Sequence, residues 1–380
     1  MRTGCALLAL VLASVAAAGE GPKLVDEARI LSNLDRVDDR GWRACVRGPY
    51  DVQLSPDGTK LLYLESRNQK VGGQDRTVRR PVVRDLASKQ VIVLAVPMAT
   101  SDDVFAYLFT SRLFDPAGRR LVLGVGIDAD GDGVTSPGMQ DGMQAAMCDI
   151  ATGKATLLDL RGPAVLPSFG RTGKHVFALS YDVKKDTGTL YRADAERLAF
   201  QPLKLLGLPR TVCPAADVMT MLVKPAKEKK TGYGLVLFDT KAGRRILDVP
   251  TQGYNWNLIK YPPRWTPDGR YLYVYDHTPY PAKYHSAIWD RETTKLLGRV
   301  DTMYPLGPGP TRTTMVLGKV MAGSKRGMIL HDAATDKRWD LAGRKVRPVT
   351  AAGGRVFYVK WTDNGDALFS ARIAMPNVRN

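Results

Sequence analysis

Residues 54–64, Leu54-Ser55-Pro56-Asp57-Gly58-Thr59-Lys60-Leu61-Leu62-Tyr63-Leu64, combine a tight turn with the apolar run that follows it. Proline fixes the backbone at the second position of a turn, aspartate is tolerated at the third, and glycine lets the chain leave where a side chain would clash. The aliphatic and aromatic residues at 61–64 favour a strand. This stretch decides the fold, because degraded copies of it recur to the C-terminus.

The copies recur at a spacing of roughly 40 to 60 residues. Each is followed by a run of aliphatic, aromatic or β-branched residues, which predicts one strand per copy. Between successive copies, an aspartate ends a strand and begins a short polar turn, whose backbone its side chain can bind. The repeat turns occupy residues 55–58, 115–118, 170–173, 214–217, 266–269, 310–313 and 351–354, and the aspartate turns begin at Asp85, Asp149, Asp194, Asp239, Asp290 and Asp332.

Two alternating turn types, each joining strands, describe a four-stranded sheet repeated around an axis. The sequence therefore predicts an all-β fold, a seven-bladed β-propeller. Six or eight blades, or an open array of β-sandwiches, are the alternatives. The seventh copy has no clear aspartate turn, and its strand at residues 367–371 lies close to the end of the chain. Closure then needs a strand from the N-terminal lead-in, because an unpaired edge exposes backbone donors and acceptors.

The N-terminus predicts export. Residues 1–18 combine one basic residue, Arg2, with an uncharged run at 5–15 and three alanines at 16–18, the pattern of a secretory signal peptide. An anchor helix is the alternative, but the run is shorter than the ~20 apolar residues of a membrane span. We divide the chain into a signal peptide (1–18), a short helical or extended lead-in (19–46) and a propeller (47–380). We expect a periplasmic or extracellular protein that is not an integral membrane protein.

The chain is strongly basic, with a formal net charge of +17. A charge of this size favours association with polyanions and also promotes solubility. The basic residues are dispersed over many turns, with one dense cluster at residues 224–230. A nucleic-acid interface would need a basic stripe with interleaved aromatic residues, so we expect no specific nucleic-acid binding.

Three cysteines remain after removal of the signal peptide: Cys45, Cys148 and Cys213. An exported compartment permits one disulfide, but the odd number and wide spacing specify no pair. Aligned by the repeat, Cys213 is expected to share the position of Phe169 and Trp265 in the strand before the turn. This alignment predicts a buried thiol in the core. It leaves the exposure of Cys148 open.

The two best-preserved copies, residues 55–64 and 266–275, resemble the repeat of TolB-type, WD40-like propellers, found in the bacterial envelope and in the propeller half of prolyl oligopeptidases. The resemblance extends, more weakly, over nearly the whole mature chain. It implies the fold and a habit of binding proteins or ligands across a propeller face, but no single activity. The peptidases it includes carry their catalytic residues on a separate α/β-hydrolase domain with a Gly-x-Ser-x-Gly turn, which this sequence lacks.

An acidic loop follows the strand of the second copy. Asp128, Asp130 and Asp132 stand at alternate positions, followed by glycine, as in the first half of a calcium loop. Val134 would contribute its backbone carbonyl. The expected acidic residue at the twelfth position is absent, but Asp141 lies two residues further on and can serve if the loop bulges. The sequence predicts a Ca²⁺ site that orders this insertion, with an acidic turn that binds no ion as the alternative; no organic cofactor is expected.

The fifth copy carries an aromatic-rich insertion at the matching place in its repeat. With the connection before that copy, it could place aromatic and imidazole groups at one mouth of the propeller, which suits a ligand or a partner. Packing at strand ends is the alternative. The two remaining histidines, His175 and His331, fall inside repeat strands and are expected to be packed. The predicted ligand or partner surface consists of Tyr254, Trp256, Tyr261, His277, Tyr280, Tyr284 and His285.

Three functional hypotheses follow. The first is an exported, non-enzymatic scaffold that binds an envelope protein or a small ligand through loops on a rigid frame. The second is a lyase or lactonase that works in the propeller channel with a bound metal, assisted by His277 or His285. The third is a polyanion-binding surface protein, whose affinity would fall steeply with added salt. No catalytic residue is assigned.

Overall fold

The structure, a computed structural model, describes residues 21–31, 34, 38, 40–46, 52–100, 112–129, 131–135, 142–182, 187–203, 208–223, 234–249, 262–277, 284–319, 327–342, 346–362 and 365–375. These residues form strands and turns. Among them there is no helix that could cross a membrane. The predicted signal peptide lies outside the described residues.

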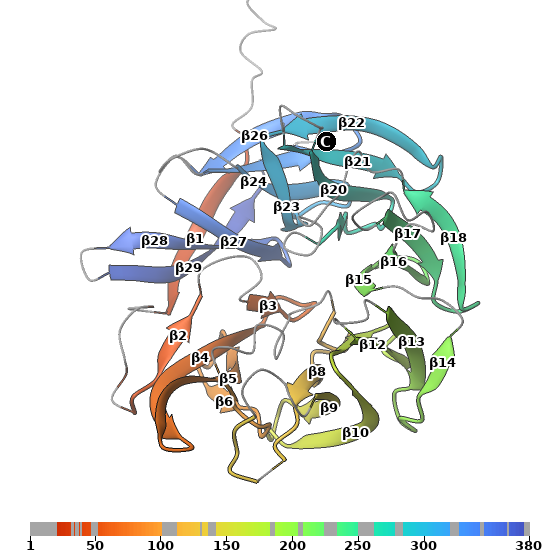
Figure 1. Ribbon diagram of the computed structural model, residues 1–380. Helices are drawn as coiled ribbons and strands as arrows, with labels where there is room; N and C mark the ends of the chain where they lie inside the picture. The colour runs from red at the N-terminus through yellow and green to blue at the C-terminus, as the bar shows by residue number, and fades with distance from the viewer. Residues whose placement is uncertain are drawn as a thin grey trace, which may run out of the picture.

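The strands form seven sheets around a central axis, which confirms the predicted seven-bladed β-propeller (Figure 1). In blades 3 to 6 the strands follow one another from the axis outward in chain order, and we call them the inner, second, third and outer strands. Blade 3 consists of β11 (Val165–Phe169), β12 (His175–Asp182), β13 (Thr187–Asp194) and β14 (Gln201–Leu203); blade 4 of β15 (Leu208–Val212), β16 (Val218–Val223), β17 (Gly234–Asp239) and β18 (Arg244–Val249); blade 5 of β19 (Arg264–Trp265), β20 (Tyr271–His277), β21 (Tyr284–Asp290) and β22 (Lys295–Asp301); and blade 6 of β23 (Met303–Pro308), β24 (Thr314–Lys319), β25 (Met328–Asp332) and β26 (Lys337–Ala342).

Blades 1 and 2 vary this plan. In blade 1 two segments, β2 and β3, both pair with the second strand β4, and a short strand β7 is added beside β5. In blade 2 residues 112–114 take the inner position, where Phe114 pairs with Leu121. The bounds are β2 (Arg43–Cys45), β3 (Val52–Leu54), β4 (Lys60–Val71), β5 (Gln74–Asp85), β6 (Val91–Val93) and β7 (Ala99–Thr100) in blade 1, and β8 (Arg120–Gly126), β9 (Met143–Asp149) and β10 (Ala155–Gly162) in blade 2.

Blade 7 joins the two ends of the chain. Its inner, second and third strands are β27 (Val346–Ala352), β28 (Arg355–Thr362) and β29 (Gly365–Ala374), and its outer strand is β1 (Lys23–Leu31). Residues 23–31 of the lead-in are therefore extended, and they supply the closing strand that the sequence required. This closure explains why the seventh copy has no aspartate turn, since no outer strand follows β29 in the chain.

The aspartate turns join third and outer strands as expected. The carboxylate of Asp239, for example, accepts hydrogen bonds from the backbone N–H groups of Lys241 and Ala242 at 2.9 and 2.8 Å. The same arrangement recurs at Asp149, whose Oδ1 accepts from the N–H of Thr152 at 2.9 Å. These local hydrogen bonds fix the reversal within each turn.

The repeat turns of the seven blades touch one another around the axis and form what we call the turn ring. Glycine is required in it for two reasons, which Gly269 illustrates. Its φ of +67° suits glycine, and an added Cβ would lie 2.6 Å from Sγ of Cys213 in the preceding blade. The contacts around the ring are Gly58 with Ala352, Gly118 with Ser55, Gly173 with Pro116, Arg171 with Asp217, Gly269 with Cys213, Asp268 with Arg312, and Gly354 with Pro310.

The predicted alignment of Cys213 is wrong by one residue. Trp265 pairs with Leu272 seven residues later, and the residue with the same spacing in blade 4 is Val212, which pairs with Met219. Cys213 is instead the first residue of the turn, so Pro214 stands at the second position, where proline belongs. The thiol is buried as predicted, and burial raises its pKa.

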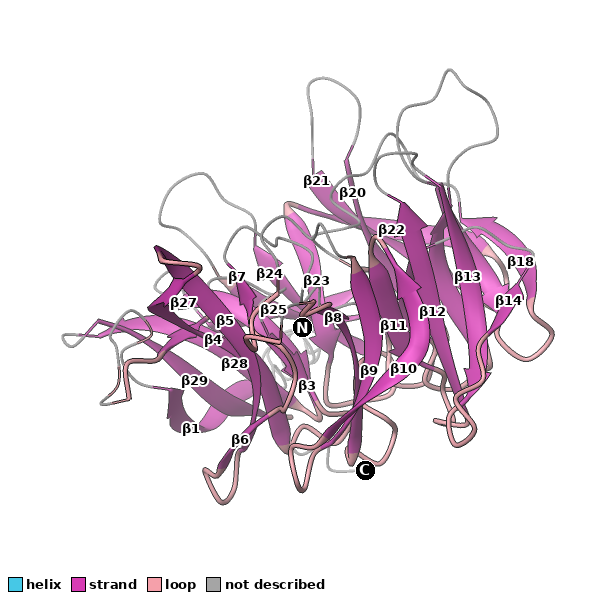
Figure 2. Cartoon of the chain, turned by 60° about the horizontal axis from the view of Figure 1, so that its bottom comes forward, coloured by secondary structure: helices cyan, strands magenta, loops and turns pink. Residues whose placement is uncertain are grey.

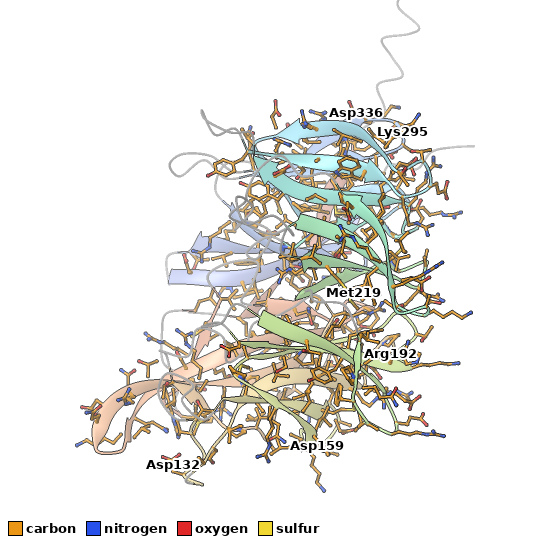
Figure 3. The ribbon with its side chains drawn as sticks, turned by 45° about the vertical axis from the view of Figure 1, so that its right-hand side comes forward. Asp132, Asp159, Arg192, Met219, Lys295 and Asp336 are labelled. Carbon is orange, nitrogen blue, oxygen red and sulfur yellow. The ribbon has the colours of Figure 1, made fainter. Side chains whose placement is uncertain are left out.

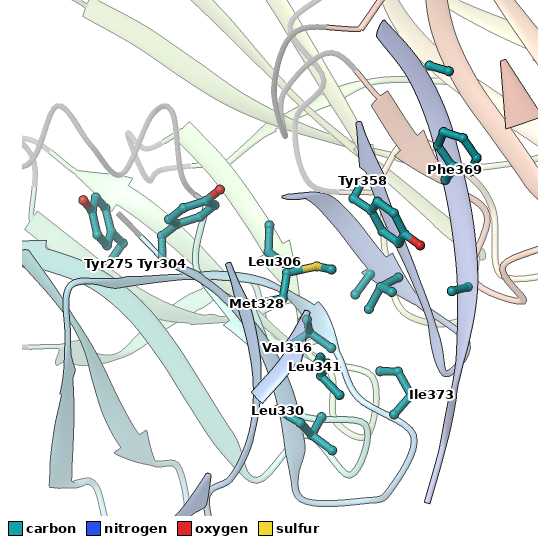
Figure 4. Close-up of a cluster of buried hydrophobic side chains, with 14 residues drawn as sticks. Tyr275, Tyr304, Leu306, Val316, Met328, Leu330, Leu341, Tyr358, Phe369 and Ile373 are labelled. Carbon is teal, nitrogen blue, oxygen red and sulfur yellow. The ribbon is translucent and has the colours of Figure 1, made fainter. Parts of the chain in front are cut away.

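Apolar side chains fill the spaces between neighbouring blades. Between blades 6 and 7, for example, Leu306 and Val316 pack against a cluster that includes Tyr358 and Ile373 (Figure 4). Cys148, whose exposure the sequence left open, is buried in the cluster between blades 1 and 2, and burial raises its pKa to about 12. Each blade is thus held by hydrophobic contact on both faces, as sheet-on-sheet packing requires.

Candidate functional site at the insertion face

The two kinds of connection lie at opposite ends of the propeller, because neighbouring strands within a blade are antiparallel. The repeat turns and the aspartate turns lie at one end, which we call the turn face. The connections between second and third strands, and those from each outer strand to the next blade, lie at the other end, the insertion face (Figure 2). Every loop that the sequence singled out for function starts and ends at the insertion face.

The structure describes part of the predicted ligand or partner surface. Tyr284 and His285 are the first two residues of β21, and the backbone of His277 ends β20. The remaining residues of the predicted surface, and the basic cluster at 224–230, lie outside the described residues: Tyr254, Trp256, Tyr261 and Tyr280.

Tyr284 belongs to an aromatic cluster between blades 5 and 6. Its ring stacks on that of Tyr275, with centroids 5.7 Å apart and planes 10° from parallel. Tyr304 meets Tyr275 edge-on at 6.2 Å (Figure 4 shows Tyr275 and Tyr304). Tyr284 is 39% exposed, whereas the other two rings are buried. The cluster therefore presents Tyr284 to solvent at the insertion face, stacked on Tyr275, which Tyr304 meets from the other blade.

Sequence reasoning missed Tyr275 and Tyr304. Tyr275 is the last tyrosine of β20 before the insertion, and alternation along that strand was an available signal. Tyr304 comes from β23 in the next blade, so only the fold shows its contact. Gly318 on β24 makes room for it, since an added Cβ would lie 2.6 Å from Cζ of Tyr304.

His285 lies inside blade 5. Its side chain is 2% exposed, and its backbone pairs with those of Asp276 and Asp301 on the neighbouring strands. An imidazole in this position does not face solvent. Tyr284 is therefore the residue of the predicted surface that the described structure opens to a ligand or partner.

The acidic loop binds its own backbone and docks on blade 1. The carboxylate of Asp128 accepts hydrogen bonds from the N–H groups of Gly131 and Gly133 at 2.8 and 2.9 Å. Oδ1 of Asp132 accepts one from the N–H of Val134 at 2.8 Å. The Val134 side chain is buried against Trp42 of blade 1. Asp132 itself is exposed, and it lies far from Asp336, which belongs to the aspartate turn that begins at Asp332 (Figure 3).

Two of the predicted calcium ligands, Asp130 and Asp141, lie outside the described residues. Among the residues that are described, no three histidine, cysteine or acidic side chains come together as a metal site. Each carboxylate oxygen keeps lone pairs beyond the hydrogen bonds it accepts, so the donor set of the loop still suits a hard cation. Calcium binding here stays a prediction.

A cavity of about 230 Å³ lies at the seam between blades 1 and 7, and we call it the seam cavity. Arg347 on β27 forms an ion pair with Asp366 on β29 at 3.3 Å. On the blade 1 side, Nε of Arg43 and Sγ of Cys45 both donate to Oγ of Ser66, at 3.2 and 3.0 Å. The sequence could not predict this site, because its walls come from both ends of the chain. Its lining residues are Leu34, Arg43, Ala44, Cys45, Val46, Arg347 and Asp366.

A hydrogen-bonded network of titratable groups runs from the space between blades 5 and 6 to the surface at Asp336. The hydroxyl of Tyr273 and Nδ1 of His331 are 2.6 Å apart, and Nε2 of His331 and Oδ1 of Asp336 are 2.8 Å apart. Burial lowers the pKa of His331 and raises that of Tyr273. The neutral imidazole therefore accepts from the tyrosine and donates to the aspartate. Both rings are buried, so this network joins two blades and does not face a substrate.

No model of a known protein family matches the sequence, and no characterised protein matches it. Solved structures share its fold at low identity. The propeller domain of the Trilobed protease from Pyrococcus furiosus, which has an open velcro topology, gives a TM-score of 0.56 at 10% identity and covers 89% of this chain and 99% of its own. An oligogalacturonate lyase in complex with manganese gives 0.55 at 14% identity, covering 94% and 98%. TolB from Acinetobacter baumannii gives 0.41 at 12% identity, covering 83% and 80%.

These likenesses show the propeller fold alone. The proteins that share it include a protease and a lyase, so the fold leaves the activity of this chain open. The WD40-like repeat family expected from the sequence stays a prediction.

Proposed function

We propose that this chain is an exported, non-catalytic binding propeller of the bacterial envelope, which recognises an envelope protein or a small ligand through its insertion face. The observation that carries the proposal is the unequal construction of the two faces. The turn ring frames one face with short turns, each of which touches the next. The other face receives every long connection, and loops that a rigid frame positions are where proteins most often place binding residues.

The aromatic cluster supports a binding role for this face. A tyrosine buries a large apolar area while its hydroxyl reaches a polar partner, which is why tyrosine is enriched at interfaces. Tyr284 is exposed, and its stacking on Tyr275 restricts its motion before any partner arrives. A side chain that is already ordered loses less entropy on binding.

The enzyme hypothesis finds less support in the described residues. A general base must come within hydrogen-bond reach of a substrate. His285 and His331 are both buried. His285 is thus closed to a substrate, and the side chain of His277 lies outside what the structure describes.

Site-specific cross-linking tests the proposal. A photo-reactive amino acid at position 284 should capture one reproducible partner from the native envelope. The matched control is position 295, an exposed lysine on the outer strand of blade 5 (Figure 3). Equal capture at both positions, or turnover of a small substrate with no capture at 284, would contradict the proposal. If capture fails in whole cells, the cross-linking is repeated with purified envelope fractions added to the protein. Capture then shows that the cells lacked the partner, and failure shows that the protein does not bind one.

Export has its own test. The mature protein recovered from the cell should begin at residue 19, and mass spectrometry of the intact chain measures this directly. A chain that retains residues 1–18 and stays in the cytoplasm would overturn the export part of the proposal.

A further inference from the structure

The described inner strands carry arginine as their only charged residue type. Residues 43–45, 52–54, 112–114, 165–169, 208–212, 264–265, 303–308 and 346–352 contain five arginines and no lysine, aspartate or glutamate. Apart from residues 43–45 of β2, which Figure 1 places further from the axis than β3, these strands surround the propeller axis. We call the five residues the inner arginines: Arg43, Arg112, Arg210, Arg264 and Arg347.

The strand register orders several inner arginines along the axis. Arg264 pairs with Tyr273 and is separated from the repeat turn at 266–269 by Trp265 alone. It therefore lies close to the turn ring. Arg347 is the second residue of β27, and Arg43 pairs with Ser66, so both lie toward the insertion face. The inner arginines of blades 1 and 7 therefore lie beside the seam cavity at the insertion face, and those of blades 4 and 5 lie further inward.

Several buried arginine Nε atoms donate no hydrogen bond among the described residues, and those of Arg264 and Arg347 are among them. Buried donors are almost always satisfied in folded proteins, so each such group calls for an explanation. A guanidinium presents five N–H groups in a fixed fork that fits a carboxylate or a phosphate.

Electrostatics point the same way. Burial lowers the pKa of Arg264. Burial lowers the pKa of Arg210, and the nearby charge of Arg264 lowers it further. Burial also lowers the pKa of Arg112, although Asp115 acts in the opposite direction. The protonated forms are thus destabilised where these arginines lie, and an anion placed between Arg210 and Arg264 would reverse this.

The turn ring and the seam cavity indicate the direction of entry. Each repeat turn contacts the next around the axis on the turn face, whereas the seam cavity on the insertion face is lined by Arg43 and Arg347. Asp366 offsets one of these two positive charges. The seam cavity therefore offers an anionic group a lining of net positive charge at the insertion face.

We propose that Arg210 and Arg264 bind a carboxylate or phosphate group of a small ligand that enters along the axis from the insertion face, past Arg347 and Arg43. This site goes beyond the partner surface around Tyr284. Either can exist without the other, because they use different residues.

Binding and stability of Arg264→Gln test the site. In calorimetric titrations of the mature protein, citrate or pyrophosphate should bind the unaltered chain, with chloride at matched ionic strength as the blank. Loss of a charge-assisted hydrogen bond should weaken binding about ten- to a hundredfold, because such bonds contribute roughly 1.5–3 kcal/mol. A response to citrate but not pyrophosphate identifies a carboxylate ligand, and the reverse identifies a phosphate ligand.

The melting temperature without ligand separates a binding role from a structural one. Removing one of two neighbouring buried cations should leave the melting temperature of Arg264→Gln unchanged or raised, while abolishing the rise that the anion causes. Arg119→Gln, at an exposed arginine directly after the repeat turn of blade 2, is the control for loss of one charge and should keep the full response. An equal anion response in both variants, or no binding of either anion, overturns the proposal. Capture at position 284 should be unaffected in Arg264→Gln.

Discussion

The turn face and the insertion face are built from the same seven blades but obey different constraints. On the turn face the connections are short, the aspartate turns satisfy part of their own backbone, and each repeat turn touches the next, so a change in one repeat turn meets a neighbour at once. On the insertion face the connections differ in length and composition from blade to blade. A repeated fold thus separates its two tasks: one face fixes the geometry of the ring, and the other is free to vary.

The largest effect should come from the turn ring. Gly269→Ala forces a side chain into φ +67° and toward Sγ of Cys213, whereas Gly73→Ala, at φ +78°, meets no atom within 4 Å. Strain costs about 1–2 kcal/mol in both, and the added clash in Gly269→Ala about 1–3 kcal/mol more. Urea unfolding measures the difference. Equal losses in the two variants would mean that the turn ring does not restrict its turns.

The acidic loop should give the next effect, because an ion bound on the insertion face would add order that the blades do not supply. Calcium at a hundred times its dissociation constant should stabilise the protein by about 2.7 kcal/mol. Asp132→Asn should remove this gain, since the substitution deletes an exposed carboxylate of the loop. Melting with calcium and with chelator measures the effect. Equal melting temperatures, together with no calcium in a direct binding assay, would rule the site out.

A third prediction concerns pH and the network between blades 5 and 6. Burial lowers the pKa of His331, so the unfolded chain binds its proton more readily than the folded one. The stability that His331 affects is therefore fully present above pH 6.5, the ordinary histidine pKa. It falls as the pH drops toward the lower pKa that His331 has in the folded protein. The slope approaches at most about 1.4 kcal/mol per pH unit. His331→Gln should flatten this slope between pH 7 and pH 5; an unchanged slope would assign it to other groups.

The smallest effect on stability should come from the insertion face itself. Tyr284→Ala removes one stacked ring from an exposed position, which costs about 0.5–1.5 kcal/mol. Its effect on partner capture should be much larger than its effect on folding. Leu297→Ala, at a half-exposed apolar residue of the outer strand β22, is the control that should leave capture unchanged. If both variants capture equally well, Tyr284 is a packing residue only.

Much of the frame could be predicted because its determinants are local. Proline, aspartate and glycine at fixed offsets specify a turn without reference to the rest of the chain, so copies such as 55–58 and 266–269 revealed the blades. The error at Cys213 arose in the fourth copy of the repeat, which keeps the proline of the turn but lacks its serine and glycine. Pro214 was then read as the first residue of the turn and not as the second.

The candidate sites could be predicted only in part, because they depend on contacts between blades. Tyr284 was found from its place beside an insertion, but its contact with Tyr275 and the approach of Tyr304 follow from the packing of blades 5 and 6. The seam cavity and the inner arginines combine residues from distant copies. No spacing along the chain indicates that Arg43 and Arg347 line one cavity.

The pairing of β1 with β29 also sets the order of folding events. Lys23, near the start of the chain, pairs with Ala374, near its end. The last blade therefore cannot form until almost the whole chain has been synthesised, and the first strand must stay unpaired until then. Contacts between such distant segments form slowly, because a long loop has to close first. For a chain exported as proposed, this delay keeps the protein open while it is threaded through the membrane and postpones ring closure until its C-terminus has crossed.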